Sequence, residues 1–423
     1  MKKKKIILGA GIAGLGAWHA DNEAEIYEAS DHAGGLCRGF EINGFYFDQA
    51  VHLSFAKDKV VRDVFDKVPQ HYHHPFPHSW YNETWLRHPA QNNLYRFPPQ
   101  FKIDAVKGFI ERKGRENVNS FKEWLVGGYG EFMYENIFRL YNEKYWQADL
   151  DKMGVQWIEN RIYQPSIDEV LYGSYTDETP NVYYASEMRY PKNGGYYSFL
   201  RCITEEAEKN GKLHLNKKAT KIDPAAKKVF FADGTDVEYD SLYSSVPLPE
   251  TVNMTDNAPQ DIIKKTGELE HTGVAIVSIG FKKTDFEEFW FYIYDTDIMA
   301  ARAYMPSVKS PYNVPEGCSS IQFEIYFSSK SKAPEENKAV ENTLYALEKL
   351  GIAKRSDVLF TDYRIMPYGN VTLLRSTEKD LPEITEWVKA QGITPIGRFG
   401  EWKYLWSDQA FLSGYNAVKQ HEG

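Results

Sequence analysis

The pattern of apolar and polar positions near the N-terminus predicts a strand, a glycine-rich turn, a helix and a second strand, in that order. IILGAGIAGLG places Gly9, Gly11 and Gly14 in a GxGxxG spacing directly after an apolar run, and EIYEAS follows as a second apolar run that ends in Glu28. Glycines at such a turn let the backbone approach a pyrophosphate, and the helix N-terminus supplies partial positive charge. An acidic residue at the end of the second strand can accept hydrogen bonds from a ribose. The pattern predicts a nucleotide-binding α/β unit.

The remaining periodicity predicts two further kinds of structure. Apolar residues recur at helical spacing from about 100 to 175, which indicates a helical domain. Alternating residues around the turn Asp233-Gly234 predict a hairpin that returns to the nucleotide unit. Residues from about 270 to 330 and from 358 to 375 also alternate, which indicates an antiparallel sheet.

The chain of 423 residues is longer than one hydrophobic core usually supports. We therefore expect an α/β fold in which a doubly wound, Rossmann-like FAD-binding domain carries an inserted helical domain and an antiparallel β-sheet domain. The expected domains are a discontinuous FAD-binding domain of residues 1–70, 193–248 and 392–423, a helical domain of residues 100–175, and a sheet domain for the substrate of residues 71–99, 176–192 and 249–391.

FAD is the expected nucleotide because of a second glycine pair. Gly34-Gly35 follows Glu28 closely, and an apolar hairpin comes next, which disfavours a nicotinamide dehydrogenase. The pair resembles the FAD-binding pattern of the amine oxidase and protoporphyrinogen oxidase group, in which it lets the chain pass close to the FAD pyrophosphate.

Charge, cysteine content and the length of apolar stretches limit which binding partners and which cellular compartment we expect. The net charge is −9 and no long basic run offsets it, which argues against nucleic acid or an anionic membrane surface. Cys37, Cys202 and Cys318 show neither a disulfide framework nor metal-ligand spacing, which fits a reducing cytoplasm. MKKKKIILGAGIAGLGA imitates a signal peptide, but its glycines and charged continuation indicate mature structure. No apolar stretch reaches the roughly 18 residues of a membrane span, so we expect a cytoplasmic protein.

Four polar clusters have more than one interpretation. FRLYNEKYW gathers Arg139, Tyr141 and Asn142 on one helix, where a structural ion pair is the simpler explanation. Arg302 lies among apolar neighbours and therefore needs an anionic partner, either a carboxylate or a phosphate. HPAQNNL gathers side-chain amides that could hold a turn or contact a base edge. HYHHPFPH, residues 71–78, lacks a carboxylate and is broken by prolines, so we expect a surface loop and no metal site.

Across nearly its whole length the sequence resembles the flavin-dependent UDP-galactopyranose mutases, the eukaryotic type more than the bacterial type. The resemblance rests on motifs that occur in the same order: GAGIAGLG, GGL, HPAQNN, SFKEWLVGGYG, FRLYNEKYW with KMGVQWI, RYPKNGG, WFYIYDTDIMAARA with SPYN, PYGNVT and GRFGEWKY. In place of the family's Gly-Gly-His before the flavin, this chain has Ala50-Val51-His52.

The resemblance implies a role for each matching position. Arg139 and Arg302 would clamp the diphosphate of a sugar nucleotide, with Tyr292, Tyr368 and Tyr404 beside it, and His52 would lie by the isoalloxazine ring. Further candidate substrate-binding residues are Gln91 at the uridine, Asn92, Tyr141, Asn142 and Trp290. The candidate cofactor-binding residues are Gly9, Gly11, Gly14, Glu28, Gly34, Gly35, Arg398, Asp408 and Gln409.

The implied function is the interconversion of UDP-galactopyranose and UDP-galactofuranose, or of a close UDP-hexose, through a covalent adduct between the sugar and reduced FAD. Such an enzyme serves cell-surface polysaccharide biosynthesis, needs a reductant, for which NAD(P)H is one candidate, and could form a homo-oligomer. Two alternatives stay open: an FAD-dependent oxidoreductase of the amine oxidase or protoporphyrinogen oxidase type, and a protein that keeps FAD without turnover.

Overall fold

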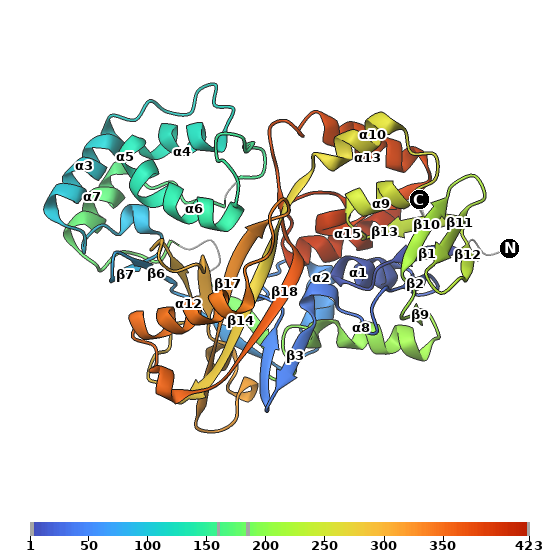
Figure 1. Ribbon diagram of the computed structural model, residues 1–423, viewed down its shortest axis with the longest axis horizontal. Helices are drawn as coiled ribbons and strands as arrows, with labels where there is room; N and C mark the ends of the chain where they lie inside the picture. Colours follow the sequence, from blue (N-terminus) through green and yellow to red (C-terminus); the bar gives the residue numbers. More distant parts are fainter. Residues whose placement is uncertain (1–3, 159–160, 183–186, 421–423) are drawn as a thin grey trace.

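A parallel sheet organises the half of the molecule that contains both chain ends (Figure 1). The computed structural model describes residues 4–158, 161–182 and 187–420. The strand order is β19-β13-β1-β2-β9 and every neighbouring pair is parallel. The strands are β1 (Lys5–Leu8), β2 (Glu25–Tyr27), β9 (Leu213–His214), β13 (Ser241–Ser244) and β19 (Ile393–Pro395). Three separate stretches of chain therefore build one nucleotide-type sheet.

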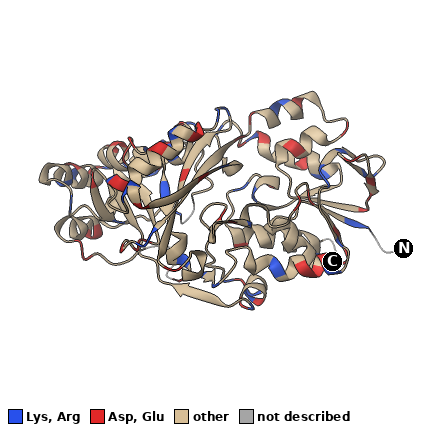
Figure 2. Ribbon diagram, turned by 60° about the horizontal axis from the view of Figure 1, so that its bottom comes forward, with Lys and Arg blue, Asp and Glu red and all other residues tan. Residues whose placement is uncertain are grey.

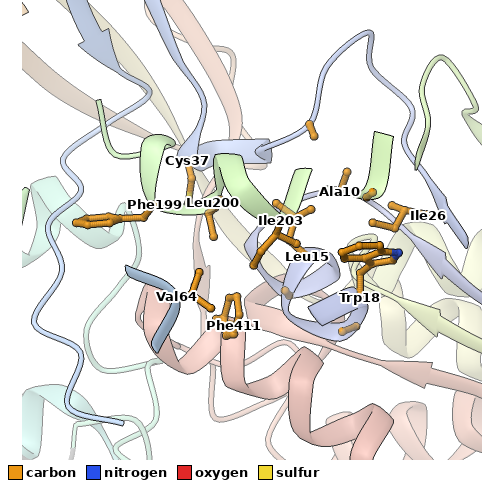
Figure 3. Packing of buried hydrophobic residues seen from close by; sticks show 14 of the residues in the cluster. Ala10, Leu15, Trp18, Ile26, Cys37, Val64, Phe199, Leu200, Ile203 and Phe411 are labelled. Carbon is orange, nitrogen blue, oxygen red and sulfur yellow. The ribbon is translucent and has the colours of Figure 1, made fainter. Parts of the chain in front are cut away.

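Helix α1 (Ile12–Ala20) lies at the centre of this half and packs on α15 (Ser407–Gln420) and α8 (Ser198–Lys209). Gly16 and Gly414 permit the close contact, because a Cβ at either position would lie about 2 Å from a carbonyl oxygen of the other helix. Trp18 on α1 and Phe411 on α15 are buried in the shared core (Figure 3). Residues near the two ends of the chain thus form one cluster.

A seven-stranded, mainly antiparallel sheet forms the second region. Its order is β18-β14-β17-β16-β15-β6-β7, in which only the β15–β6 pair is parallel among the described strands. The strands are β6 (His78–Tyr81), β7 (Thr84–Arg87), β14 (Glu270–Lys282), β15 (Trp290–Ile293), β16 (Arg302–Tyr304), β17 (Cys318–Ser328) and β18 (Val358–Thr372). Helix α12 (Glu336–Lys349) packs in the same apolar core as β14 and β17. The antiparallel sheet expected from alternation is confirmed.

Short helices form the third region and pack against β14 and β17. They are α3 (Pro99–Ile110), α4 (Phe121–Tyr129), α5 (Glu131–Met133), the π-helical turn η3 (Tyr134–Phe138), α6 (Arg139–Trp146) and α7 (Ile167–Tyr175). Ser120 with Glu123 and Ser166 with Glu169 form capping boxes that start α4 and α7. The mixed α/β fold class, with its helical and antiparallel parts, is confirmed.

Smaller elements complete the fold. Two small sheets have two strands each: β3 (Gly39–Ile42) with β4 (Phe45–Asp48), and β5 (Gln70–His73) with β8 (Met188–Pro191). A third sheet has three strands, β10 (Ala219–Asp223), β11 (Lys228–Phe231) and β12 (Asp236–Glu238). The remaining helices are α2 (Lys59–Phe65), α9 (Leu248–Met254), α10 (Gln260–Gly267), α11 (Pro306–Lys309), α13 (Asp380–Ala390) and α14 (Gly397–Gly400). The predicted hairpin turn is present, with Gly234 at φ +85°.

The expectation of a surface loop over residues 71–78 holds only for residues 74–77, which connect two strands. His71 and His73 lie on β5, which pairs with β8, and His78 begins β6. The partner strand comes from residues more than a hundred positions later, so no local pattern reveals it.

Charged positions are distributed over all three regions of the ribbon (Figure 2). Within the described part of the chain, every helix is too short or too polar to cross a bilayer.

Candidate active site

A cavity of about 1250 Å³ runs between the three regions. At one end it is lined by the β1–α1 turn and Glu28, and at the other by the sheet residues Tyr292 and Arg302 and the helix residue Tyr141. One space therefore connects the nucleotide-type turn to the predicted diphosphate residues.

The β1–α1 end has the shape of a dinucleotide cradle. Gly9 has φ +94°, and a Cβ on Gly14 would lie 1.9 Å from the Gly9 carbonyl oxygen, so Gly14 packs under the turn without lining the cavity. Gly34 and Gly35 also have positive φ, and a Cβ on Gly35 would lie 3.1 Å from the Gly11 Cα. The two stretches are in direct backbone contact, with the Gly34 N–H donating to the Ala10 carbonyl at 2.9 Å, and Gly9, Gly11, Gly34 and Gly35 together give the cavity a wall of bare backbone where an FAD pyrophosphate would lie.

Glu28 directly follows β2 and lies beside this cradle. Its Oε2 accepts a hydrogen bond from the Ala10 N–H at 2.7 Å, and its Oε1 accepts one from the Ser30 N–H at 2.9 Å. The carboxylate is thereby fixed at the cavity wall, where the ribose of a bound dinucleotide would lie. The bare backbone at the glycines fits the pyrophosphate of FAD, and the Glu28 carboxylate fits a ribose hydroxyl of the same cofactor.

The turn Ala50-Val51-His52 lines the middle of the cavity. Ala50 adopts φ +87°, a region that residues with a Cβ rarely occupy. The His52 Nδ1 lies 3.1 Å from the Ala50 carbonyl oxygen, and burial lowers the pKa of His52 to about 4. His52 is therefore neutral near pH 7.

Arg398 lines the same part of the cavity but is engaged by the protein. Its Nε donates to the Leu405 carbonyl at 2.8 Å, and its Nη1 donates to the Asn370 Oδ1 at 3.1 Å. Arg398 therefore ties the segment 397–405 to the end of β18.

Arg302 reaches the far end of the cavity from β16. Its Nε donates to Glu324, a fully buried carboxylate that also accepts from the Tyr326 hydroxyl at 2.7 Å and the Val51 N–H at 2.8 Å. Burial alone would raise the pKa of Glu324, but the Arg302 charge and the Tyr326 hydroxyl bring it below its usual value. Within the described chain, no hydrogen bond engages the two terminal amino groups of Arg302.

Aromatic hydroxyls gather around Arg302. The hydroxyls of Tyr145 and Tyr404 lie 2.9 Å apart, and the ring of Tyr141 meets that of Tyr292 edge-on at 5.4 Å. Trp290 donates from its indole to the Tyr292 hydroxyl at 3.2 Å. Burial raises the pKa of Tyr141 and of Tyr404, so both stay protonated donors.

Gln91 and Asn142 also line the cavity, each held by one protein contact. The Gln91 Nε2 donates to the Tyr163 carbonyl at 3.1 Å, and the Asn142 Nδ2 donates to the Phe138 carbonyl at 2.8 Å. Tyr368 lines the side nearer α9 and donates its hydroxyl to Glu250 at 2.7 Å. Tyr368 is thus not grouped with the tyrosines around Arg302.

Arg139 does not join Arg302, contrary to expectation. It lies outside the cavity lining with its side chain 36% exposed, and Glu135 and Glu143 on neighbouring turns bind its Nε and Nη1. The simpler explanation of this cluster, a local ion pair, describes the geometry. Asn92, Asp408 and Gln409 also lie outside the cavity lining, although Gln409 accepts from the Trp406 N–H at 2.9 Å where α15 begins.

Arg161, which the sequence patterns did not single out, lines the cavity instead. Its guanidinium lies over the rings of Tyr404 and Trp406, with its Cζ 4.7 and 4.4 Å from the ring centroids. Nothing in the local polarity of WIENRIYQP marks this residue, although it lies three positions after the end of the KMGVQWI motif. His88, a second unpredicted residue, lies 4.3 Å from the ring of Tyr292, and burial lowers its pKa to about 3.

Comparison with known proteins agrees with this geometry. The family model described as flavin containing amine oxidoreductase matches residues 19–317. The crystal structure of reduced UDP-galactopyranose mutase is similar over all of this chain and 94% of its own, with a TM-score of 0.94 and 26% sequence identity. No curated protein matches the sequence.

Two more distant structures share the fold alone. A protoporphyrinogen oxidase candidate from Exiguobacterium sp. 255-15 is 14% identical, with a TM-score of 0.76 over 100% of this chain and 99% of its own. A putrescine oxidase variant is also 14% identical, with a TM-score of 0.69 over 99% of this chain and 98% of its own.

The family match covers well over half of the chain, and the glycine cradle with Glu28 fits the cofactor that the match implies, which is FAD. The chain belongs to the flavin-containing amine oxidoreductase family.

Proposed function

We propose that this protein interconverts UDP-galactopyranose and UDP-galactofuranose, or a close UDP-hexose, and that it does so with reduced FAD. The observation that carries the proposal is one cavity that leads from the FAD cradle to two guanidinium groups and several buried tyrosine hydroxyls. Likeness over the full chain to a reduced UDP-galactopyranose mutase supports the same function.

The diphosphate would be held by Arg302 and Arg161. Arg302 keeps its two terminal amino groups for a ligand, since Glu324 takes only the Nε. Arg161 approaches from the helical region, where the aromatic rings of Tyr404 and Trp406 support its planar group. The two terminal amino groups of Arg302 can bind phosphate oxygens through paired, charge-assisted hydrogen bonds, whereas Arg161, whose Nε and Nη2 donate to the Trp157 and Tyr404 carbonyls, would act mainly through its positive charge. In this proposal Arg161 takes the place that the sequence suggested for Arg139.

The tyrosines would stabilise the diphosphate as it leaves the sugar. Bound reduced FAD supplies an electron-rich ring nitrogen that can act as a nucleophile toward the anomeric carbon. Hydroxyl donors from Tyr292 and from the Tyr145–Tyr404 pair would share the charge that develops on the departing phosphate oxygen. Preorganised donors in a buried site stabilise such charge more effectively than water does. Retaining UDP beside the sugar also makes its return effectively unimolecular.

The nucleoside would lie toward Gln91. The side-chain amide of Gln91 is oriented by the Tyr163 carbonyl, and the adjacent ring pair of His88 and Tyr292 offers a flat, neutral surface. We propose that this end of the cavity binds the uracil. In the same proposal the reaction takes place in the cytoplasm, draws electrons from NAD(P)H or another reductant, and supplies galactofuranose for cell-surface polysaccharides.

The direct experiment is to incubate the dithionite-reduced protein with UDP-galactofuranose and follow UDP-galactopyranose by chromatography. Product that forms only with reduced flavin, and that disappears in Arg302→Ala, supports the proposal. Arg139→Ala is the matched control, because it removes a guanidinium that lies outside the cavity.

An oxidoreductase of the amine oxidase type is the second candidate, favoured by the name of the matching family. Steady hydrogen peroxide production with amines, and no sugar product with reduced protein, would select it. That reaction needs no pair of arginines at a diphosphate, so the Arg302→Ala variant also separates the two candidates.

A further inference from the structure

A buried ion pair lies behind the Ala50–His52 turn. Lys309, at the end of α11, is 0% exposed, and its Nζ donates to the Asp48 Oδ2 at 2.9 Å. The same ammonium lies 4.0 Å from the ring centroid of Tyr304 and 4.8 Å from that of Tyr190. A lysine in the core needs such partners, because an unpaired buried charge is strongly unfavourable.

Asp48 is the anchor of the turn. Its carboxylate accepts from the Tyr190 hydroxyl at 2.8 Å and from the Tyr196 N–H at 2.9 Å, and its carbonyl oxygen accepts from the Ala50 N–H at 3.1 Å. The four residues that follow Asp48, numbers 49 to 52, all line the cavity. Ala50 keeps its unusual φ of +87° only because surrounding contacts impose it. The Lys309 contact is one of these, since it holds the carboxylate from which the turn starts.

The pair lies outside the cavity wall but acts electrostatically on residues that line it. Burial is the largest influence on His52 and lowers its pKa, while Asp48 raises the pKa of His52 and Lys309 lowers it. Burial and Asp48 together raise the pKa of the Cys37 thiol to about 12. Cys37 and His52 line the cavity, whereas Asp48 and Lys309 do not. At His52 the two buried charges therefore act in opposite directions, whereas at Cys37 only Asp48 acts.

We propose that Lys309 is a positioning residue for the flavin, which holds the 49–52 turn through Asp48 and neutralises the Asp48 charge, so that the reduction potential of bound FAD depends on this distant ion pair. The inference rests on the cofactor of the proposed function and not on its sugar substrate. A failure of the mutase reaction would leave it standing.

The test is the midpoint potential of FAD in the full-length holoprotein, titrated against reference dyes. Lys309→Met leaves the Asp48 charge uncompensated, and because reduction adds electrons to the flavin, we expect a more negative potential. Asp48→Asn leaves the Lys309 charge instead, and we expect a more positive potential. The double variant removes both charges, and we expect its potential to return toward that of the unchanged protein.

Two further variants separate charge from packing. Lys309→Arg keeps the positive charge, so we expect it to keep the potential even if its melting temperature falls. Lys59→Met breaks an exposed pair with Asp63 and should shift nothing. In Asp48→Asn the amide oxygen can still accept from the Tyr196 N–H, and the amide nitrogen can donate to the Tyr190 hydroxyl oxygen, so the sign of the shift in this variant decides the test once the variant is shown to be folded and FAD-loaded. No shift, or a negative shift, in FAD-loaded and folded Asp48→Asn overturns the inference.

Discussion

Arg161 lies over the ring of Tyr404 with its Cζ 4.7 Å from the ring centroid, and its Nη2 donates to the carbonyl oxygen of the same residue at 2.7 Å. Tyr404 in turn shares a hydroxyl contact with Tyr145. An arginine from the helical region, a tyrosine from the C-terminal segment and a tyrosine from α6 thus form one wall of the cavity. This wall lies toward Arg302, whose guanidinium is 5.5 Å from the Tyr145 ring.

Replacement of Arg161 by alanine is expected to slow the proposed isomerisation. Loss of one preorganised donor to a developing anion typically lowers kcat by about 10²–10³-fold. Steady-state rates of the reduced protein with UDP-galactofuranose measure the effect. Arg139→Ala should leave kcat unchanged and lower the free energy of unfolding by no more than about 1 kcal/mol, because exposed ion pairs contribute little. Equal losses in the two variants would contradict the assignment of Arg161.

The close packing of Gly14 in the glycine cradle predicts that a larger residue there weakens FAD binding. In Gly14→Ala the new Cβ would lie 1.9 Å from the Gly9 carbonyl oxygen and 3.3 Å from the Ile7 Cγ2, so the turn must move. Overpacking of this kind costs about 1–3 kcal/mol, and if this cost falls on the FAD-bound state, FAD binding weakens by about 5- to 150-fold. Flavin absorbance after gel filtration reports it. Gly267→Ala, where a Cβ would meet nothing within 4 Å, is the control and should retain FAD fully.

Buried neutral histidines predict how stability depends on pH. Burial lowers the pKa of His52 to about 4 and that of His88 to about 3, whereas both titrate near 6.5 in the unfolded chain. The unfolded state therefore binds more protons as the pH falls below 6.5, so stability is fully present above that pH and is lost toward pH 4. Each residue contributes on the order of 1–3 kcal/mol over this window.

Urea unfolding at pH 7.5 and pH 5 checks this dependence. His88→Gln cannot take up a proton, so its stability should fall less between the two pH values than that of the unchanged protein. An identical fall would mean that His88 is protonated in the folded state as well.

Features that depend on local periodicity were predictable from the sequence. The GxGxxG turn, the alternating strands β14, β17 and β18, and the Asp233-Gly234 hairpin each depend on neighbours within a few positions. β5 was not predictable, because its hydrogen-bond partner β8 lies far away in the chain. Short-range patterns contain no information about such pairing.

The same limit explains why sequence reasoning found Arg302, misplaced Arg139 and missed Arg161. Arg302 was identified because an arginine among apolar residues needs an anion, and Glu324 on the adjacent strand together with the cavity meets that need. Arg139 has carboxylates four residues away on either side, and this local pairing outweighs its match to a motif. Arg161 acquires its environment from Tyr404 and Trp406, about 240 residues later, so only the folded chain reveals it.

The Arg302–Glu324 pair allows its structural and its proposed chemical role to be separated. Arg302→Met leaves a buried carboxylate without its cation, which typically costs about 3–5 kcal/mol of stability. In Arg302→Met/Glu324→Gln no uncompensated charge remains, and the glutamine Oε1 can still accept from the Val51 N–H while its Nε2 donates to the Tyr326 hydroxyl oxygen. We expect the double variant to regain most of the melting temperature and to bind FAD. It should nevertheless stay inactive, because the guanidinium for the diphosphate is missing. Recovery of isomerisation together with stability would mean that Arg302 only neutralises Glu324, and the proposed clamp would then be wrong.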